Sequence, residues 1–177
     1  PAENLVGQEN KGWDYAKFLL GNERTGIARV GASKAKVARI KQLAAMEREG
    51  DQPLIEDPKF REKLAAIEVE LKALEMTQLR VVSDERKREK GRQNPASSIL
   101  KISGSVIQQR LTELMMEVVG PYVMPYHPPE EGQNEPPIGP DYAAAAGPIY
   151  FNYRKVSIYG GSNEIQHNII AKAILGL

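Results

Sequence analysis

The sequence has no cysteine and only two histidines among its 177 residues. Disulfide bonds and zinc sites made of thiolates are therefore excluded, and two separated imidazoles are a poor ligand set for any metal ion. A formal net charge of +1 gives no general electrostatic reason to expect a nucleic acid or an anionic membrane as a partner. No apolar run is long enough to span a bilayer and no signal peptide opens the chain, so we expect a cytoplasmic protein without membrane insertion.

The length suits one domain with a sizeable core. The chain starts with Pro1 rather than methionine, which suggests a fragment or a processed chain. Residues 1–12 are polar and contain glycine. We therefore expect them to be a connector that leads into one domain over 13–177.

Apolar residues recur at spacings of three and four in several segments, which predicts helices. We expect three long helices over 13–49, 58–90 and 96–119 and a shorter one over 162–175. The most regular stripe belongs to the second helix and consists of Phe60, Leu64, Ile67, Leu71, Leu74 and Val81. The charged run at 84–90 continues that helix as a solvated end. No strand is predicted, so the fold class is all-α, an antiparallel four-helix bundle.

Eight of the twelve prolines lie in residues 121–148. This segment cannot form a regular helix. It is too long for a routine connection, which leaves a functional loop, an interface arm or a disordered segment. A further short helix is expected to start near Tyr150 and to break at Gly160 and Gly161.

The end of the chain carries the most specific signal. Gly160 and Gly161 precede Ser162, a residue suited to cap a final helix. Free backbone amides at a helix start bind anionic or carbonyl oxygen. The segment from Tyr159 to Gln166 reads Tyr-Gly-Gly-Ser-Asn-Glu-Ile-Gln. It resembles the C-terminal signature of the acyl-CoA dehydrogenase family, which usually reads Tyr-Glu-Gly-Thr-x-Glu-Ile-Gln.

Two other segments are similar to the same family. Residues 1–13 look like the stretch by which its members leave their middle β-domain. The triplet 22–24, Asn-Glu-Arg, stands where the first helix of the C-terminal domain approaches the substrate. The resemblance covers essentially the whole chain. It implies the isolated C-terminal third of such an enzyme, bacterial in type, without the N-terminal helical domain and the middle β-domain.

Members of this family act in fatty acid metabolism and oxidise an acyl-CoA thioester to the 2,3-enoyl-CoA. A carboxylate removes the α-proton while FAD accepts the β-hydride. The thioester α-proton is a very weak acid, so fixed donors must polarise the carbonyl, each contributing roughly 2.7–4 kcal/mol. The base also needs a raised pKa. The resemblance further implies an electron-transfer flavoprotein as acceptor and a homo- or hetero-oligomer formed through the bundle. The 177 residues alone are expected to be inactive.

Two positions bear on the identity of the base: one differs from the usual family pattern and one matches a second family arrangement. Most members carry the catalytic glutamate directly after the tyrosine of the tail, where this chain has Gly160. In the isovaleryl and long-chain types the glutamate lies on the first helix of this domain, before an arginine, and Glu23-Arg24 matches that pair. The resemblance thus implies that Glu23 is the base and that Gly160 donates its N–H to the thioester oxygen. Without the resemblance, Glu23 reads as a surface carboxylate near a helix start.

Three more residues are matched to substrate contacts. Arg24 would order the base helix near the substrate, although an ordinary surface salt bridge is the alternative. Tyr159 would pack near the thioester and the flavin, with core packing equally open. Lys172 stands where an arginine often meets the CoA end, and a solvated lysine is the alternative.

Three residues are matched to flavin contacts. Ser162 occupies the position of the family's threonine, where it also serves as an N-cap. Glu164 stands at the position that contacts ribityl or pyrophosphate groups. Arg48 matches an arginine that contacts the flavin of a neighbouring subunit.

Other positions depart from the family. Gly50 and Asp51 replace the threonine-phenylalanine pair that follows the Arg48 position, and Glu117 stands where a glutamine is usual. Negative charge there is unfavourable beside a pyrophosphate. These departures resemble a divergent branch, such as the large-subunit type of pimeloyl-CoA dehydrogenase. The alternatives are a non-catalytic assembly subunit of a heteromeric dehydrogenase and a related acyl-CoA oxidase.

Overall fold

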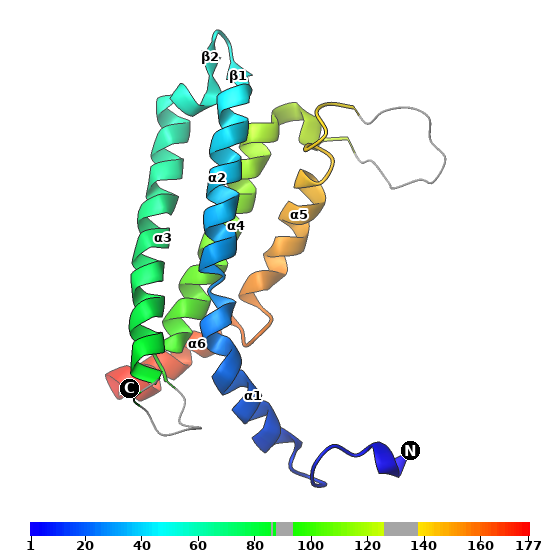
Figure 1. The fold of residues 1–177 in the computed structure, drawn as a ribbon, viewed down its shortest axis with the longest axis vertical. Coiled ribbons are helices and arrows are strands. Elements are labelled where there is room, and N and C mark those ends of the chain that lie inside the picture. The colour runs from blue at the N-terminus through cyan, green and yellow to red at the C-terminus, as the bar shows by residue number, and fades with distance from the viewer. Residues whose placement is uncertain (86, 88–93, 126–137) are drawn as a thin grey trace.

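The computed structural model describes residues 1–85, 87, 94–125 and 138–177; for residues 20–25 and 85 only the backbone is described. It confirms an all-α fold (Figure 1). The α-helices are α1 (Gly12–Ile27), α2 (Val30–Met46), α3 (Pro58–Glu85), α4 (Ser97–Val119), α5 (Ala146–Tyr153) and α6 (Asn163–Ile170). Most of the charged run predicted at 84–90, and residues 126–137 of the proline-rich loop, lie outside the described residues.

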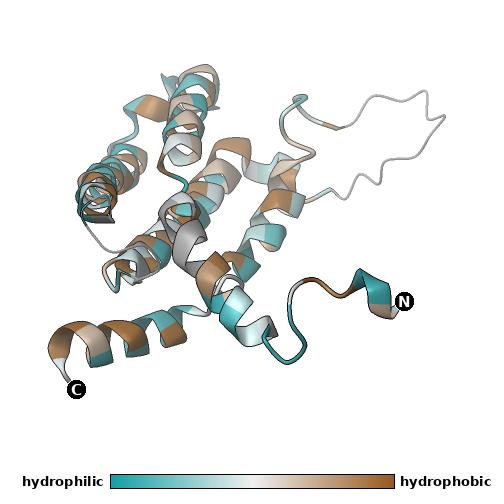
Figure 2. Cartoon of the chain, turned by 60° about the horizontal axis from the view of Figure 1, so that its bottom comes forward, coloured by the Kyte–Doolittle hydropathy of each residue, from teal (hydrophilic) through white to brown (hydrophobic). Residues whose placement is uncertain are grey.

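Helices α2, α3, α4 and α5 run alternately up and down beside one another, which confirms the antiparallel bundle (Figure 1). The short α5 takes the fourth place, whereas α6 crosses the end of the bundle close to α1 (Figures 1 and 2). Helix α4 is central because it contacts each of α1, α2, α3, α5 and α6. No helix within the described part of the chain is long and apolar enough to cross a membrane.

The predicted apolar stripes form the core. All six stripe residues of α3 are buried, as are Ile107, Leu111, Leu114 and Val118 on α4. The start of α3 is also as expected: Pro58 is its first residue, and an oxygen of Asp57 accepts a hydrogen bond from the N–H of Phe60 at 2.7 Å. Such an N-cap satisfies a backbone donor that has no partner inside the helix.

The expected single helix over 13–49 is wrong. The chain breaks between α1 and α2 at Arg29, whose φ of 49° is left-handed. At this break the backbone of α4 comes unusually close. A Cβ built on Gly104 would lie 2.8 Å from both Cα and O of Ala28, which is fully buried. The interruption is therefore a consequence of tertiary packing, supported by the absence of a side chain at Gly104.

The prediction of no strand is also wrong. Residues Arg48–Glu49 (β1) pair antiparallel with Gln52–Pro53 (β2) in a two-residue hairpin. Its turn contains Gly50 at a φ of 62°, a conformation that costs glycine little because it has no Cβ. The hairpin closes the connection between α2 and α3 at the end of the bundle far from α6 (Figure 1).

Two later boundaries differ from expectation. Helix α5 begins at Ala146, inside the segment predicted as a loop, and Pro148 fits because a helix leaves its first N–H groups without intrahelical partners. The helix expected from Tyr150 ends at Tyr153 and continues as a 3-10 turn, Arg154–Ser157. The final helix is confirmed with Ser162 as its N-cap, and it ends in a π-helical segment, Ala171–Leu175.

The approach of Gly104 to Ala28 predicts a specific sensitivity. We expect Gly104→Ala to destabilise the chain by about 1–3 kcal/mol, because the new methyl must displace backbone rather than a flexible side chain. Gly31→Ala is the matched control: Gly31 is also helical, but its Cβ position has no neighbour within 4 Å. There the gain in helix propensity should stabilise by about 0.5–1 kcal/mol. Urea denaturation of both variants checks this, and equal effects would contradict the packing argument.

Candidate functional site

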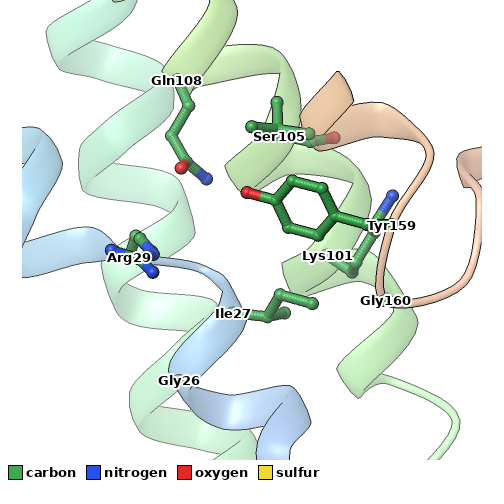
Figure 3. Close-up of a pocket in the computed structure, with 9 residues that line it drawn as sticks. Gly26, Ile27, Arg29, Lys101, Ser105, Gln108, Tyr159 and Gly160 are labelled. Atoms are coloured by element: carbon green, nitrogen blue, oxygen red, sulfur yellow. The ribbon is translucent and has the colours of Figure 1, made fainter. Parts of the chain in front are cut away.

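A cavity of about 370 Å³ lies where the end of α1, one face of α4 and the turn before α6 meet (Figure 3). Its described lining includes glycines, polar side chains and two cationic side chains. The lining residues are Gly26, Ile27, Arg29, Lys101, Ser105, Gln108, Val156, Tyr159 and Gly160. Tyr159 and Gly160, two neighbouring residues singled out in the sequence, therefore both line one concave site.

Helix α4 supplies a buried polar stripe to this cavity. Lys101, Ser105 and Gln108 follow one another at spacings of four and three, which places them on one face of the helix. Each is less than a tenth exposed. Sequence reasoning missed all three, because α4 carries polar residues on other faces as well and their helical spacing alone is not distinctive.

The ammonium of Lys101 ties α4 to the turn that leads into α6. Its Nζ donates to the carbonyl oxygen of Ser157 at 2.9 Å and to Oδ1 of Asn163 at 2.7 Å. The amide of Asn163 in turn donates to the hydroxyl of Ser105 at 3.1 Å. Burial lowers the pKa of Lys101 below its ordinary value, and the negative charge of Glu164 opposes this shift. The network fixes both ends of the turn against α4.

The turn depends on two consecutive glycines. Gly160 and Gly161 have φ angles of 69° and 83°, which favour residues without a side chain. A Cβ on Gly160 would lie 2.7 Å from Cδ1 of Ile27, and one on Gly161 would lie 2.5 Å from Nε2 of Gln166. The backbone conformation therefore disfavours a side chain at position 160, and the terminal methyl of Ile27 would have to move to admit one.

Ser162 and Glu164 lie directly after the glycines. The hydroxyl of Ser162 accepts from the N–H of Ile165 at 3.5 Å. The pKa of Glu164 is lowered by a hydrogen bond from its own backbone N–H and by one from Ser162. An ionised carboxylate at a helix N-terminus is also favoured by the helix dipole. The first turn of α6 thus presents an exposed anion and backbone donors close together.

The other predicted site residues occupy three places. The backbones of Glu23 and Arg24 lie in α1, one turn before the cavity residue Ile27, while their side chains lie outside the described residues. Lys172 is exposed at the far end of the last helix. Arg48 lies in β1 at the opposite end of the bundle and donates to the backbone oxygen of Asp51 (Figure 1). The structure does not bring Arg48 or Lys172 to the cavity.

The carboxylate of Glu117, which departs from the family pattern, is not isolated. It accepts two hydrogen bonds from Nζ of Lys63, at 2.8 and 2.9 Å. The same pairing raises the pKa of Lys63. An exposed pair of this kind contributes little to stability, but it partly neutralises the negative charge on this part of α4.

Comparison with known proteins gives the same family as the sequence motifs. The family described as acyl-CoA dehydrogenase, C-terminal domain, matches residues 10–175. The chain is 29% identical to the acyl-CoA dehydrogenase IpdE1 of Mycobacterium tuberculosis, over 99% of the chain and 41% of that protein. It is 30% identical to IpdE1 of Mycolicibacterium smegmatis, over 98% of the chain and 38% of that protein. The chain thus spans about two fifths of these relatives.

Solved structures agree on the fold. The ChsE4-ChsE5 complex of Mycobacterium tuberculosis matches with a TM-score of 0.75 at 24% identity, covering the whole chain and 44% of the solved one. Butyryl-CoA dehydrogenase of Megasphaera elsdenii matches with a TM-score of 0.71 at 21% identity, covering 99% of the chain and 42% of that protein. Because the family match extends over nearly all residues, the chain belongs to the acyl-CoA dehydrogenase family, to the C-terminal domain of that family.

Proposed function

We propose that this chain is the C-terminal domain of a flavin-dependent enzyme that dehydrogenates an acyl-CoA thioester between its α and β carbons. The product is the 2,3-enoyl-CoA. Glu23 takes the α-proton, and the N–H of Gly160 donates to the thioester oxygen as that oxygen gains negative charge. The thioester is held in the cavity between α1 and the turn before α6.

The observation that carries this proposal is the left-handed conformation of Gly160 at the wall of the cavity, beside the terminal methyl of Ile27. With its Cβ position 2.7 Å from Cδ1 of Ile27 and a φ of 69°, position 160 is poorly suited to a glutamate. A base for this cavity must come from elsewhere. Glycine, by contrast, leaves a backbone amide that a ligand oxygen can approach without a side chain in the way.

The register of α1 supports Glu23 as that base. Glu23 precedes Gly26 by three residues and Ile27 by four, the spacing that places residues on the same face of an α-helix. Both later residues line the cavity. Position 23 thus shares its helix spacing with two residues that line the cavity, which supports Glu23 as the base.

The residues around the tail fit a flavin. Ile158, Tyr159 and Ile165 are exposed apolar side chains beside the start of α6, and they suit a flat ring system. Glu164, with its lowered pKa, is an acceptor for hydroxyl groups, and the hydroxyl of Ser162, which hydrogen-bonds to it, lies in the same cap. When bound, the flavin supplies the acceptor for the β-hydride. Arg48, at the other end of the bundle, would serve the flavin of a second subunit.

The acyl-CoA is thus the first partner, with Arg24 and Lys172 as the residues proposed to contact it outside the cavity. We further propose an electron-transfer flavoprotein as acceptor and an oligomer formed through the bundle. Exposed apolar side chains on α1 and near the chain end are consistent with contacts to other domains or subunits. They are Trp13, Phe18, Leu19, Ile174 and Leu175.

Replacing the proposed base tests the mechanism. In the full-length enzyme, Glu23→Gln should lower turnover of an acyl-CoA by about 10²- to 10⁴-fold, because general-base catalysis is lost. Flavin content, read from visible absorbance, should stay normal. Glu56→Gln is the control, since Glu56 is an exposed carboxylate in the turn before α3. Near-normal turnover by Glu23→Gln would refute the assignment. A full-length protein that binds no flavin, or is not bleached anaerobically by any acyl-CoA, would favour an assembly subunit.

The glycine turn allows a second test. Gly160→Ala places a methyl against Ile27 and shifts the amide from its position, so kcat/KM should fall by at least about tenfold, because small misplacements at a reacting group are costly. Gly176→Ala is the matched control: its φ of 72° is similar, but its Cβ position has no neighbour within 4 Å. Steady-state kinetics of the two full-length variants provide the measurement. Equal losses would mean that backbone strain, and not the cavity contact, is responsible.

A further inference from the structure

The cavity contains a buried cation that the mechanism so far does not use. Lys101 is only 2% exposed, and it lines the same cavity as Gly160. Its two hydrogen-bond partners, Ser157 and Asn163, are neutral oxygen acceptors. An ammonium has three donors, so one N–H is left beyond these two bonds.

No carboxylate among the described residues forms an ion pair with Lys101. The acid that acts on it electrostatically, Glu164, is itself exposed to solvent. A second cation, Arg29, lines the cavity as well. A buried charge without a counter-ion is costly, and negative charge received in this cavity would offset that cost.

The two hydrogen-bond partners of Lys101 flank Gly160 in the sequence. Ser157 lies three residues before Gly160 and Asn163 lies three residues after it. Lys101 binds both, and Figure 3 shows its side chain beside the turn that carries Gly160. The positive charge is therefore held next to the amide to which the proposed function assigns the thioester oxygen.

We propose that Lys101 is a fixed positive charge for the reaction: it holds the Gly160 turn in place and stabilises the negative charge that develops on the thioester oxygen. This inference rests on the proposed function. A preorganised charge in a water-poor site acts strongly because it needs no reorganisation during the reaction. In the ground state the thioester is neutral, so the charge favours the enolate-like state over the bound substrate.

The test measures the ionisation of a bound ligand rather than turnover alone. A 3-oxoacyl-CoA has acidic α-protons, and its enolate is visible by ultraviolet absorbance when titrated on the full-length enzyme. We expect Lys101→Met to weaken this ionisation at least about tenfold, so that the enolate forms at a pH about one unit higher. Lys155→Met is the control: Lys155 is exposed on the same connection, two residues from Ser157, and should leave the titration unchanged.

Asn163→Asp separates charge from position. The aspartate keeps an oxygen acceptor for Nζ of Lys101 but adds a counter-ion, so the turn stays in place while the field is neutralised. We expect the bound ligand to ionise at higher pH, as in Lys101→Met, with flavin content and thermal stability close to wild type. This variant keeps the test decisive if Lys101→Met does not fold.

The outcomes distinguish this inference from the proposed function. If wild type ionises the ligand and oxidises an acyl-CoA, but Asn163→Asp titrates as wild type, the proposed function stands and Lys101 is only a structural tie. If wild type binds no acyl-CoA and is not bleached by one, the proposed function fails and the inference fails with it. A parallel upward shift of the ionisation pH in both variants supports the inference.

Discussion

The contact between the backbones of Gly104 and Ala28 is the constraint on which the site depends. A single Cβ at position 104 would lie 2.8 Å from the Ala28 backbone, so α4 passes the junction of α1 and α2 more closely than ordinary residues allow. Because α4 also contacts α3, α5 and α6, this approach fixes the central helix against every other α-helix. The break at Arg29 lies next to the same point, and the cavity opens beside it.

The face of α4 that contains this contact also holds the glycine turn near the end of the chain. Lys101 lies one turn before Gly104 and Ser105 lies directly after it. The two side chains reach Ser157 and Asn163, the residues that bracket the glycine turn. A change in the approach of α4 would therefore move the turn as well. The site is rigid because one helix positions both of its walls.

Local sequence patterns predicted the features that depend on neighbouring residues, namely the buried helix faces and the N-cap of the last helix. The stripe from Phe60 to Val81 marks a buried helix face because burial at helical spacing is visible in the sequence itself. Ser162 was predictable as an N-cap because a serine before a helical segment caps it through its own hydroxyl. The break at Arg29 was not predictable, because alanine and arginine are ordinary helix residues and its partner Gly104 is distant in sequence. The hairpin at Arg48 was missed because two residues are too short for a strand pattern.

The candidate site divides in the same way. The motif around Gly160 identified the family and two of the residues that line the cavity, Tyr159 and Gly160. It did not reveal Lys101, whose function depends on which face of α4 meets the turn. From the sequence alone, polar residues of an amphipathic helix are expected to face solvent. Only the packing shows that Lys101 is buried and has no carboxylate partner within the described residues.

The glycine at position 160 and the cation at position 101 have a common explanation. A glutamate in the turn would stand three residues from both acceptors of the Lys101 ammonium. If such a carboxylate reached the ammonium, the two opposite charges would pair and weaken the field at the proposed position of the thioester oxygen. The pairing would also lower the pKa of a base that needs a raised one. If the base comes from α1, as proposed, carboxylate and ammonium belong to different helices, α1 and α4, and each would act on a different atom of the substrate.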